Sequence, residues 1–462
     1  MRQEKDFLGT KQIPDDCYYG INTARALENF GNSGKTDNYF IKAYLLVKKA
    51  CALTNKDINS IDSGKADAIL SAIDEMLEKE LYADIVVNPL SGGAGTSMNM
   101  NINEVISNRA LEMAGMNKGE YSFISPLNDV NMHQSTNDTF PTALKVAILF
   151  YLNDLETVFT AMQESLQVKE KEFSNIVKLG RTEMQDALPI TVGMQFSAYA
   201  EAVGRDRWRV FKSRERIKTV NLGGTAIGTG FNAPKEYIFK ATDKLKELTG
   251  LNISRAENLV DATQNLDSIV EVSGIIKAAA VNLMKISEDF RILSSGPKGG
   301  LGEFILPAMQ EGSTIMPGKV NPVIPEFVTQ ACLQVMSSDL TISMAAAMGN
   351  LELNQFYPLV AHLVLNNLKL VKDAAQALDI KVIKGLKLNE AQINKNLSDS
   401  VAIFTYLSQF VGHDSAALAY EKHKKTGKTA KDIFVEDGLL TAQKYDELVR
   451  PDRLTMLGFR KD

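Results

Sequence analysis

Histidine and cysteine are scarce in this chain of 462 residues, which has four of the former and three of the latter. The histidines stand at positions 133, 362, 413 and 423, and the cysteines at 17, 51 and 332. No two histidines have the spacing of a metal-ligand pair, so a zinc or iron site is not expected. The cysteines form no CxxC pattern, and their odd number argues against a disulfide framework. We therefore expect no metal, no disulfides and a reducing, cytoplasmic location.

Long apolar runs and an excess of positive charge are also missing. No segment approaches the ~20 apolar residues of a membrane span, and the first residues, Met-Arg-Gln-Glu-Lys-Asp, contain no apolar signal core. The formal net charge is −5, which offers no broad basic surface to nucleic acid or to an anionic membrane. A small molecule is therefore the expected partner, without nucleic acid or membrane.

Apolar periodicity predicts long helices in the middle of the chain. Apolar residues recur every three or four positions over 142–166 and, without interruption, over 269–293. Further long helices are expected at roughly 186–217, 322–348 and 356–379. About five helices of this length far exceed the usual mean of ~11 to 12 residues. The predicted fold is therefore mainly α, with an elongated helical bundle.

The bundle has no second half that would complete it within one chain. We infer a homo-oligomer that buries helices between subunits, with a monomeric bundle closed by its flanking domains as the alternative. The predicted domains are a mixed or helical N-terminal domain (1–136), the central long-helix domain (137–391) and a small C-terminal helical domain (392–462).

The segment 312–322, Gly-Ser-Thr-Ile-Met-Pro-Gly-Lys-Val-Asn-Pro, has the composition of an active-site lid. Glycines flank the hydroxyl pair Ser313 and Thr314, as the hinges of a closing loop require. Asn321 suits a helix cap and the following proline suits the first turn, so Lys319 and Asn321 are expected at a helix N-terminus, where anions bind. The site would hold a carboxylate or phosphate; an ordinary Gly/Pro loop is the alternative.

Two more segments, 95–101 and 134–138, place Ser, Thr and Asn just before strongly helical runs. Simple N-capping, worth roughly 1 kcal/mol, explains one such residue per helix but not three or four in a row. Clustered neutral hydroxyls and amides suit the recognition of planar carboxylates.

These segments resemble the signatures of the aspartase/fumarase superfamily, and the resemblance spans nearly the whole chain. The matching segments are 95–101, 134–138, 180–186 (Gly-Arg-Thr-Glu-Met-Gln-Asp), 224–230 (Gly-Thr-Ala-Ile-Gly-Thr-Gly) and 312–322. Within the superfamily the chain looks most like the aspartase branch. The sequences of the segments 18–23, 231–237 and 410–413 resemble the aspartase form, and so does Thr136, where fumarases more often have Ser.

The resemblance implies a carbon–nitrogen lyase that converts L-aspartate reversibly to fumarate and ammonia through an aci-carboxylate intermediate. It implies that Ser313 is the general base that takes the Cβ proton. The implied substrate contacts are Thr96, Ser135, Thr136 and Thr314 for the β-carboxylate, Lys319 and Asn321 for the α-carboxylate, and Asn137 and Thr182 for the amino group. It also implies a three-domain fold, a homotetramer with a multi-helix core and active sites shared between subunits, and no cofactor.

Glu183 departs from the family pattern, because fumarases commonly carry His there and aspartases Gln or His. The change weakens the fumarase interpretation. The carboxylate could attract the substrate ammonium, or it could be a solvated or salt-bridged surface residue. Glu326 falls where the family often pairs a Glu with that His, so Glu183 and Glu326 are predicted to be close.

Three alternatives remain open at this point. The first is fumarate hydratase, which shares the fold and nearly every carboxylate-binding residue. The second is a lyase that acts on another amino-dicarboxylate, such as a methylated aspartate or a succinyl adduct. The third is a catalytically silent helical scaffold, against which the intact hydroxyls count.

Overall fold

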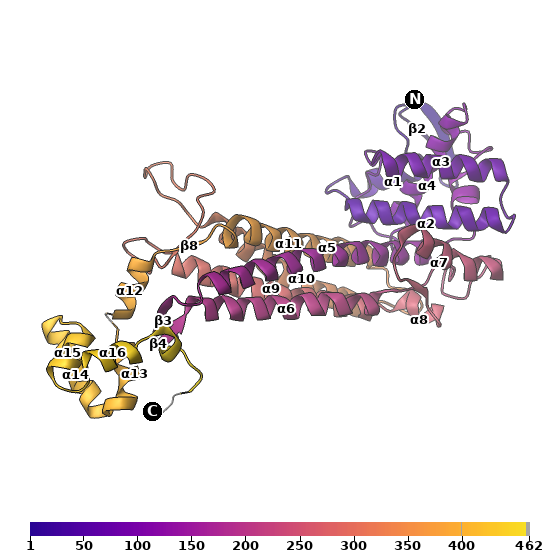
Figure 1. Ribbon diagram of the computed structural model, residues 1–462. Coiled ribbons are helices and arrows are strands. Elements are labelled where there is room, and N and C mark those ends of the chain that lie inside the picture. The colour runs from indigo at the N-terminus through magenta and orange to yellow at the C-terminus, as the bar shows by residue number, and fades with distance from the viewer. Residues whose placement is uncertain (399, 459–462) are drawn as a thin grey trace. The chain divides into compact units, whose positions relative to one another are not determined.

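The chain is mainly helical, as its apolar periodicity predicts (Figure 1). The structure is a computed structural model that describes residues 1–398 and 400–458. Position 399 and positions 459–462, which belong to the predicted C-terminal domain, lie outside the described residues. None of the described helices combines the length and apolar character of a membrane span.

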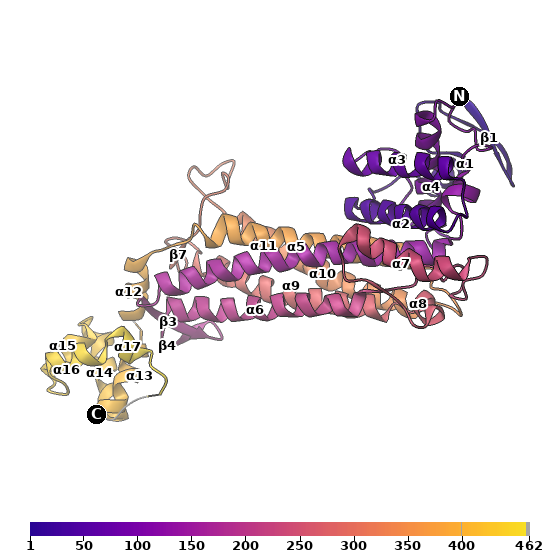
Figure 2. The same cartoon turned by 45° about the vertical axis from the view of Figure 1, so that its right-hand side comes forward.

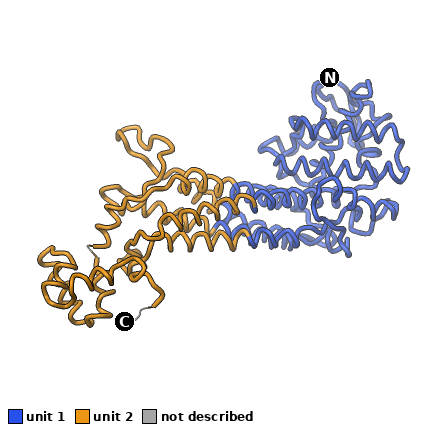
Figure 3. Tube along the Cα trace, viewed as in Figure 1, with its two compact units in different colours: residues 1–156, 208–280, 333–372 blue, residues 157–207, 281–332, 373–462 orange. Residues whose placement is uncertain are grey.

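The chain divides into two compact units (Figure 3). The first comprises residues 1–156, 208–280 and 333–372, and the second comprises 157–207, 281–332 and 373–462. The predicted three-domain division, with boundaries after residues 136 and 391, stays a prediction.

Five long helices have residues in both units, and within each unit their segments lie side by side (Figure 1, Figure 2). They are α5 (Thr136–Glu172), α6 (Val192–Ile217), α9 (Asp267–Leu293), α10 (Val323–Ala347) and α11 (Tyr357–Leu378). Every predicted seam residue of α9 is buried: Ile269, Val272, Ile276, Ala279, Leu283, Ile286, Phe290 and Leu293. The uninterrupted spacing of three and four thus identified the packed face of this helix correctly.

One predicted helix was too long at its N-terminal end. Residues expected to begin a helix at 186 instead form β4 (Gln185–Thr191), which pairs antiparallel with β3 (Val177–Thr182). Pro189 explains the difference, because proline disfavours helical conformation in the preceding residue. The apolar residues at 188, 190 and 192 also alternate with a period of two, which is typical of a strand.

The remaining elements of the first unit are helices and short strands. They are β1 (Arg2–Asp6), β2 (Gly9–Ile13), α1 (Ile21–Phe30), α2 (Asn38–Asp57), α3 (Ser63–Glu78), α4 (Thr96–Met113), the π-helical turn η1 (Pro126–Val130), β5 (Thr219–Val220), α7 (Lys235–Thr249), β6 (Ser254–Arg255) and α8 (Leu259–Gln264). β1 and β2 form an antiparallel hairpin, and β5 pairs parallel with β6.

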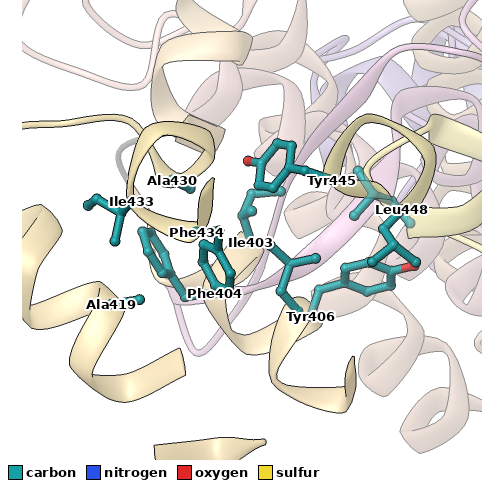
Figure 4. Packing of buried hydrophobic residues seen from close by; sticks show 11 residues of the cluster. Ile403, Phe404, Tyr406, Ala419, Ala430, Ile433, Phe434, Tyr445 and Leu448 are labelled. Carbon is teal, nitrogen blue, oxygen red and sulfur yellow. The ribbon is translucent and has the colours of Figure 1, made fainter. Parts of the chain in front are cut away.

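The remaining elements of the second unit are short strands and the C-terminal helices. They are β7 (Phe304–Ile305), the π-helical turn η2 (Asp379–Ile383), β8 (Lys387–Leu388), α12 (Glu390–Ser398), α13 (Ala402–Val411), α14 (His413–Thr426), α15 (Ala430–Glu436), α16 (Ala442–Leu448) and α17 (Pro451–Leu454). β7 pairs antiparallel with β8. The C-terminal helices enclose a small apolar core in which Phe404 and Phe434 lie 5.7 Å apart between ring centroids (Figure 4).

Two buried carboxylates hold the N-terminus of α1. Glu104 accepts hydrogen bonds from the backbone N–H groups of Gly20, Asn22 and Thr23. Glu4 accepts one from the backbone N–H group of Ile21. These bonds satisfy donors that a helix start leaves unpaired, and the negative charges face the positive end of the helix dipole. The segment 18–23 therefore has a structural role at this helix start.

We expect Gly20→Ala to destabilise the protein by about 1–3 kcal/mol through overpacking. An added Cβ atom would lie 2.6 Å from the Tyr121 hydroxyl and 2.7 Å from a Glu4 oxygen. The denaturant midpoint of unfolding measures the loss. Gly299→Ala is the matched control, because a Cβ atom there meets nothing within 4 Å; equal midpoints for the two variants would contradict the crowding.

Candidate active site

Two helices, α4 and α5, begin within the first unit at the hydroxyl clusters that the sequence singles out. α4 starts at Thr96 and α5 at Thr136. Gly95, which precedes α4, has a left-handed backbone with φ of 94°, and a Cβ atom on it would collide with the ring of Phe140 in α5. Only glycine permits this approach, so the two N-termini that carry Thr96 and Thr136 lie against each other.

The side chains of this hydroxyl cluster differ in exposure. Thr96 is exposed and its hydroxyl donates to the Gly93 carbonyl at 2.7 Å, whereas Thr136 is buried. Ser135 is half-buried, and its Oγ accepts a hydrogen bond from the Asn137 backbone at 3.1 Å. The cluster therefore presents neutral donors and acceptors at a partly open surface of the first unit.

The buried carboxylate of Asp138 holds the backbone of the cluster in place. Its Oδ1 accepts the backbone N–H of Ser135 at 3.0 Å, and its Oδ2 accepts those of Gly223 and Thr225 at 3.1 and 3.0 Å. Burial raises the pKa of Asp138 to about 6, while the amide hydrogen bonds oppose that rise. One side chain thus ties the start of α5 to the glycine-rich segment 223–230.

Asn137 is fixed by the same segment. Its Nδ2 donates to the Ala226 carbonyl at 2.7 Å, and its own carbonyl accepts from Asn221 Nδ2 at 2.9 Å. One N–H bond of the amide is thereby used within the protein, and among the described residues none donates a hydrogen bond to the amide oxygen. An acceptor at this position suits an ammonium group.

The loop 312–322 of the second unit closes on itself at its base. The backbone N–H of Gly312 donates to the Lys319 carbonyl at 2.8 Å, and the Asn321 side chain donates to the Gly312 carbonyl at 2.8 Å. A Cβ atom on Gly312 would lie 2.6 Å from the Lys319 oxygen. The glycine is therefore required by close packing at the base of the loop.

Ser313 lies inside this loop with two donors at its oxygen. The backbone N–H groups of Ile315 and Met316 donate to Ser313 Oγ at 3.2 and 2.9 Å. Hydrogen bonds to the charged form of a group favour ionisation, so this geometry stabilises negative charge on Oγ. Thr314 and Lys319 are exposed in the same loop.

The predicted helix cap at Asn321 was wrong. α10 begins at Val323, one residue later than the proposed first turn at Pro322, and the Asn321 amide holds the loop instead. The carbonyl of Gly312 competes successfully for this amide because the loop brings it within hydrogen-bond distance.

Thr182 and Glu183 lie exposed at the tip of the β3–β4 hairpin in the second unit. Glu183 and Met184 form the two-residue turn, with φ angles of 53° and 63°. Positive φ at both central residues is typical of a type I′ turn, and it is uncommon for residues other than Gly, Asn and Asp. The predicted closeness of Glu183 and Glu326 stays a prediction.

The hairpin is anchored by an ion cluster that the sequence did not predict. Glu303, fully buried, accepts from Arg181 Nη2 at 2.6 Å and from Asn396 Nδ2 at 2.9 Å, and it lies 3.3 Å from Lys178 Nζ. The positive neighbours hold the pKa of Glu303 below its usual value against the opposing effect of burial. The cluster links β3 to α12.

A cleft of 1510 Å³ opens in the second unit, and its lining includes Arg181, Lys319, Asn321 and Glu326. The structure thus brings the two predicted carboxylate-clamping residues, Lys319 and Asn321, to one cavity. Within the described residues no group of three or more His, Cys, Asp or Glu side chains lies close enough together to hold a metal ion.

The predicted site residues fall into two sets. Thr96, Ser135, Thr136 and Asn137 belong to the first unit, and Thr182, Glu183, Ser313, Thr314, Lys319 and Asn321 belong to the second. Sequence analysis missed Asp138, although it stands inside the segment 134–138 as an acid in the first turn of a predicted helix. It also missed Lys48, a cation within the apolar run that starts at position 43.

Comparisons with known proteins agree along the chain. The Lyase family model matches residues 9–337, and the model of the fumarase C C-terminus matches 403–456. Among curated relatives, aspartate ammonia-lyase from a Bacillus species is 42% identical over 459 residues, which are 99% of this chain and 98% of that protein.

Solved structures match equally completely. The fumarate lyase/delta-crystallin protein of Brucella melitensis, solved with bound cobalt, has a TM-score of 0.93 at 41% identity and covers 99% of this chain and 100% of its own. Class II fumarase of Schistosoma mansoni has a TM-score of 0.89 at 34% identity, covering 97% and 98%.

We expect Asp138→Asn to lower the free energy of unfolding by about 1–3 kcal/mol, because an NH₂ group replaces an oxygen that accepts buried backbone N–H donors. Chemical denaturation checks this expectation. Asp414→Asn, at an exposed position, is the control and should stay within about 0.5 kcal/mol of the wild type. An Asp138→Asn variant as stable as the control would show that the three hydrogen bonds contribute little.

Proposed function

The chain belongs to the aspartase/fumarase superfamily of lyases, and from this membership we propose that it catalyses the reversible deamination of L-aspartate to fumarate and ammonia. The enzyme is accordingly a carbon–nitrogen lyase. The 42% identity to an aspartate ammonia-lyase over 99% of the chain favours this reaction over hydration of fumarate, since the class II fumarase is 34% identical. Glu183 points the same way, because it replaces a histidine that is common in the hydratases.

The geometry at Ser313 is the observation that carries the proposal. Removing a proton beside a carboxylate needs a base, and a serine can act as one only when its ionised form is stabilised. Two backbone N–H groups meet its oxygen, and Lys319 follows six residues later in the same loop. We assign Ser313 as the base that takes the Cβ proton of L-aspartate.

The negative charge that proton removal creates resides on the β-carboxylate. Neutral donors from Thr96, Ser135, Thr136 and Thr314 would hold this group, in the manner of an oxyanion hole. Lys319 and Asn321 would bind the α-carboxylate, and their place in the 1510 Å³ cleft supports this assignment. Closure of the loop would exclude water and bring Ser313 to the substrate.

The leaving amino group would contact Asn137, Thr182 and Glu183. The amide oxygen of Asn137, which accepts no hydrogen bond from the part of the chain that the structure describes, supports its part, because an ammonium group donates hydrogen bonds and accepts none. The Glu183 carboxylate would add charge complementarity, since opposite charges strengthen a hydrogen bond. Its exposure at the hairpin tip leaves it accessible to a ligand.

We also propose a homotetramer whose active sites are shared between subunits. The proposed contacts come from both units of the chain, and an exposed apolar face on α10 supports association. Leu333, Leu340 and Met344 are 51%, 65% and 57% exposed and lie at steps of seven and four on one side of this helix. Such a face marks a protein interface.

The three unpaired cysteines support a reducing cytoplasm as the location.

The direct test follows fumarate absorbance in the ultraviolet with L-aspartate and, separately, with L-malate. We expect fumarate and equimolar ammonia from aspartate and none from malate. Ser313→Ala should lower kcat by at least about 10²-fold, the scale of a lost group that stabilises developing charge, with the circular dichroism spectrum and oligomer size unchanged. Fumarate from malate alone would identify a hydratase, and an active Ser313→Ala variant would refute the base assignment.

Shared active sites predict complementation between two inactive variants. Ser313→Ala and Ser135→Ala tetramers should each be inactive, whereas unfolding and refolding them as an equal mixture should restore about a quarter of the sites if each site draws the two residues from different subunits. Mixing without unfolding is the control. Failure of the refolded mixture to gain activity would place both residues in one subunit.

A further inference from the structure

Lys48, on α2, is a cation buried within the first unit. Its side chain is 1% exposed, and its Nζ donates to Asn99 Oδ1 at 2.7 Å, Gln134 Oε1 at 2.8 Å and Asn131 Oδ1 at 3.1 Å. Three acceptors use all three N–H bonds of an ammonium group, whereas a neutral amine has only two. The hydrogen bonds therefore fit the charged form of the side chain.

No carboxylate balances this charge directly. Among the described residues Lys48 forms no ion pair, and its three partners are neutral amides. The buried carboxylate of Asp138 attracts Lys48 without a hydrogen bond, which opposes the effect of burial on the pKa of Lys48. Its own hydrogen bonds are with the backbone N–H groups of Ser135, Gly223 and Thr225. A buried charge without an opposite partner is costly, and burial lowers the pKa of Lys48 to about 7. The arrangement thus holds positive charge that an anion would stabilise.

The partners of Lys48 belong to the same two helix N-termini that carry the hydroxyl cluster. Asn99 lies in the first turn of α4, where its backbone N–H donates to Gly95, the residue before Thr96. Gln134 directly precedes Ser135. Two hydrogen-bond partners of the ammonium group therefore adjoin the hydroxyl cluster along the chain, Asn99 three residues after Thr96 and Gln134 next to Ser135.

We propose that Lys48 is a positioning residue whose buried charge makes the neutral hydroxyl cluster selective for the second carboxylate of a dianionic dicarboxylate. It acts through Asn99 and Gln134, which it orients, and through space on the bound carboxylate. In the low-dielectric interior this attraction is weakly screened. The inference rests on the proposed function, which places the β-carboxylate at these hydroxyls.

The proposal predicts a charge-dependent loss in Lys48→Met, which keeps the length of the side chain without its charge. The probes are succinate, a dianion, and succinamate, which replaces one carboxylate by an amide of the same shape. We expect the Kd of succinate to rise at least about tenfold and that of succinamate less than about threefold, as measured by isothermal titration calorimetry. Equal changes for the two probes, or none, would overturn the proposal.

Kinetics supply a second readout that a purely structural role would not give. Charge on the β-carboxylate increases when the Cβ proton leaves, so Lys48→Met should lower kcat for L-aspartate by a larger factor than it raises KM. A rise in KM without loss of kcat would contradict the proposal.

Lys145 provides the matched control. It is also buried in the first unit, at 6% exposure, and its Nζ donates to the Thr219 carbonyl at 2.8 Å rather than to the hydroxyl cluster. Lys145→Met should therefore leave the ratio of the two dissociation constants at its wild-type value. If Lys145→Met changed the ratio of the succinate and succinamate Kd values as much as Lys48→Met, the loss of selectivity would not be specific to Lys48.

Asn131→Asp tests the same charge without removing Lys48, and it decides the question if Lys48→Met does not fold. The new carboxylate would lie 3.1 Å from the ammonium group and accept the donors that already meet Asn131 Oδ1. We expect folding to persist and succinate affinity to fall at least about tenfold. Wild-type affinity in a folded Asn131→Asp protein would overturn the proposal.

Failure of the proposed function is distinguishable from failure of this inference. A wild-type protein that neither binds succinate nor releases fumarate from L-aspartate would overturn both. A wild-type protein that does both, with a Lys48→Met variant of unchanged selectivity, would overturn only the role of Lys48.

Discussion

A single buried carboxylate, that of Asp138, receives three backbone N–H groups, and the hydroxyl cluster of the first unit depends on it. Ser135 is held at the start of α5, and the segment 223–230 is held beside Asn137 by the same group. Backbone N–H groups in surface loops can hydrogen-bond to water, which does not fix their positions. Here the Asp138 carboxylate accepts these hydrogen bonds, so the cluster is positioned before any ligand binds, as efficient binding requires.

Buried charges are held in two different ways. In the first, Glu104, Asp138 and Lys48 are buried among amides and hydroxyls, and none of them has its main hydrogen bonds with an oppositely charged side chain. In the second, Glu303 is neutralised by Lys178 and Arg181. Ion pairs suit a fixed hairpin, because the charges cancel locally. Charges held by dipoles keep a field that extends to a neighbouring site.

The fold could be predicted from the sequence where the apolar periodicity extends over many residues, and the candidate site could be predicted only in part. Uninterrupted steps of three and four located the buried face of α9, and clustered hydroxyls marked the start of α5. The β3–β4 hairpin was missed because a short strand adjoining a long helix blends into its apolar pattern. Glu303 and Lys48 were missed because their partners are distant in sequence, and only the folded chain brings them together.

The tight turn at Glu183 and Met184 bears on how this chain would respond to laboratory evolution. Both residues hold positive φ angles, which Asn and Gly adopt at lower energetic cost. A screen that rewards heat resistance alone therefore favours Glu183→Asn and Met184→Gly, and it discards the carboxylate proposed to lie beside the leaving amine. Selection for robustness and selection for substrate choice would act on the Glu183 codon in opposite directions.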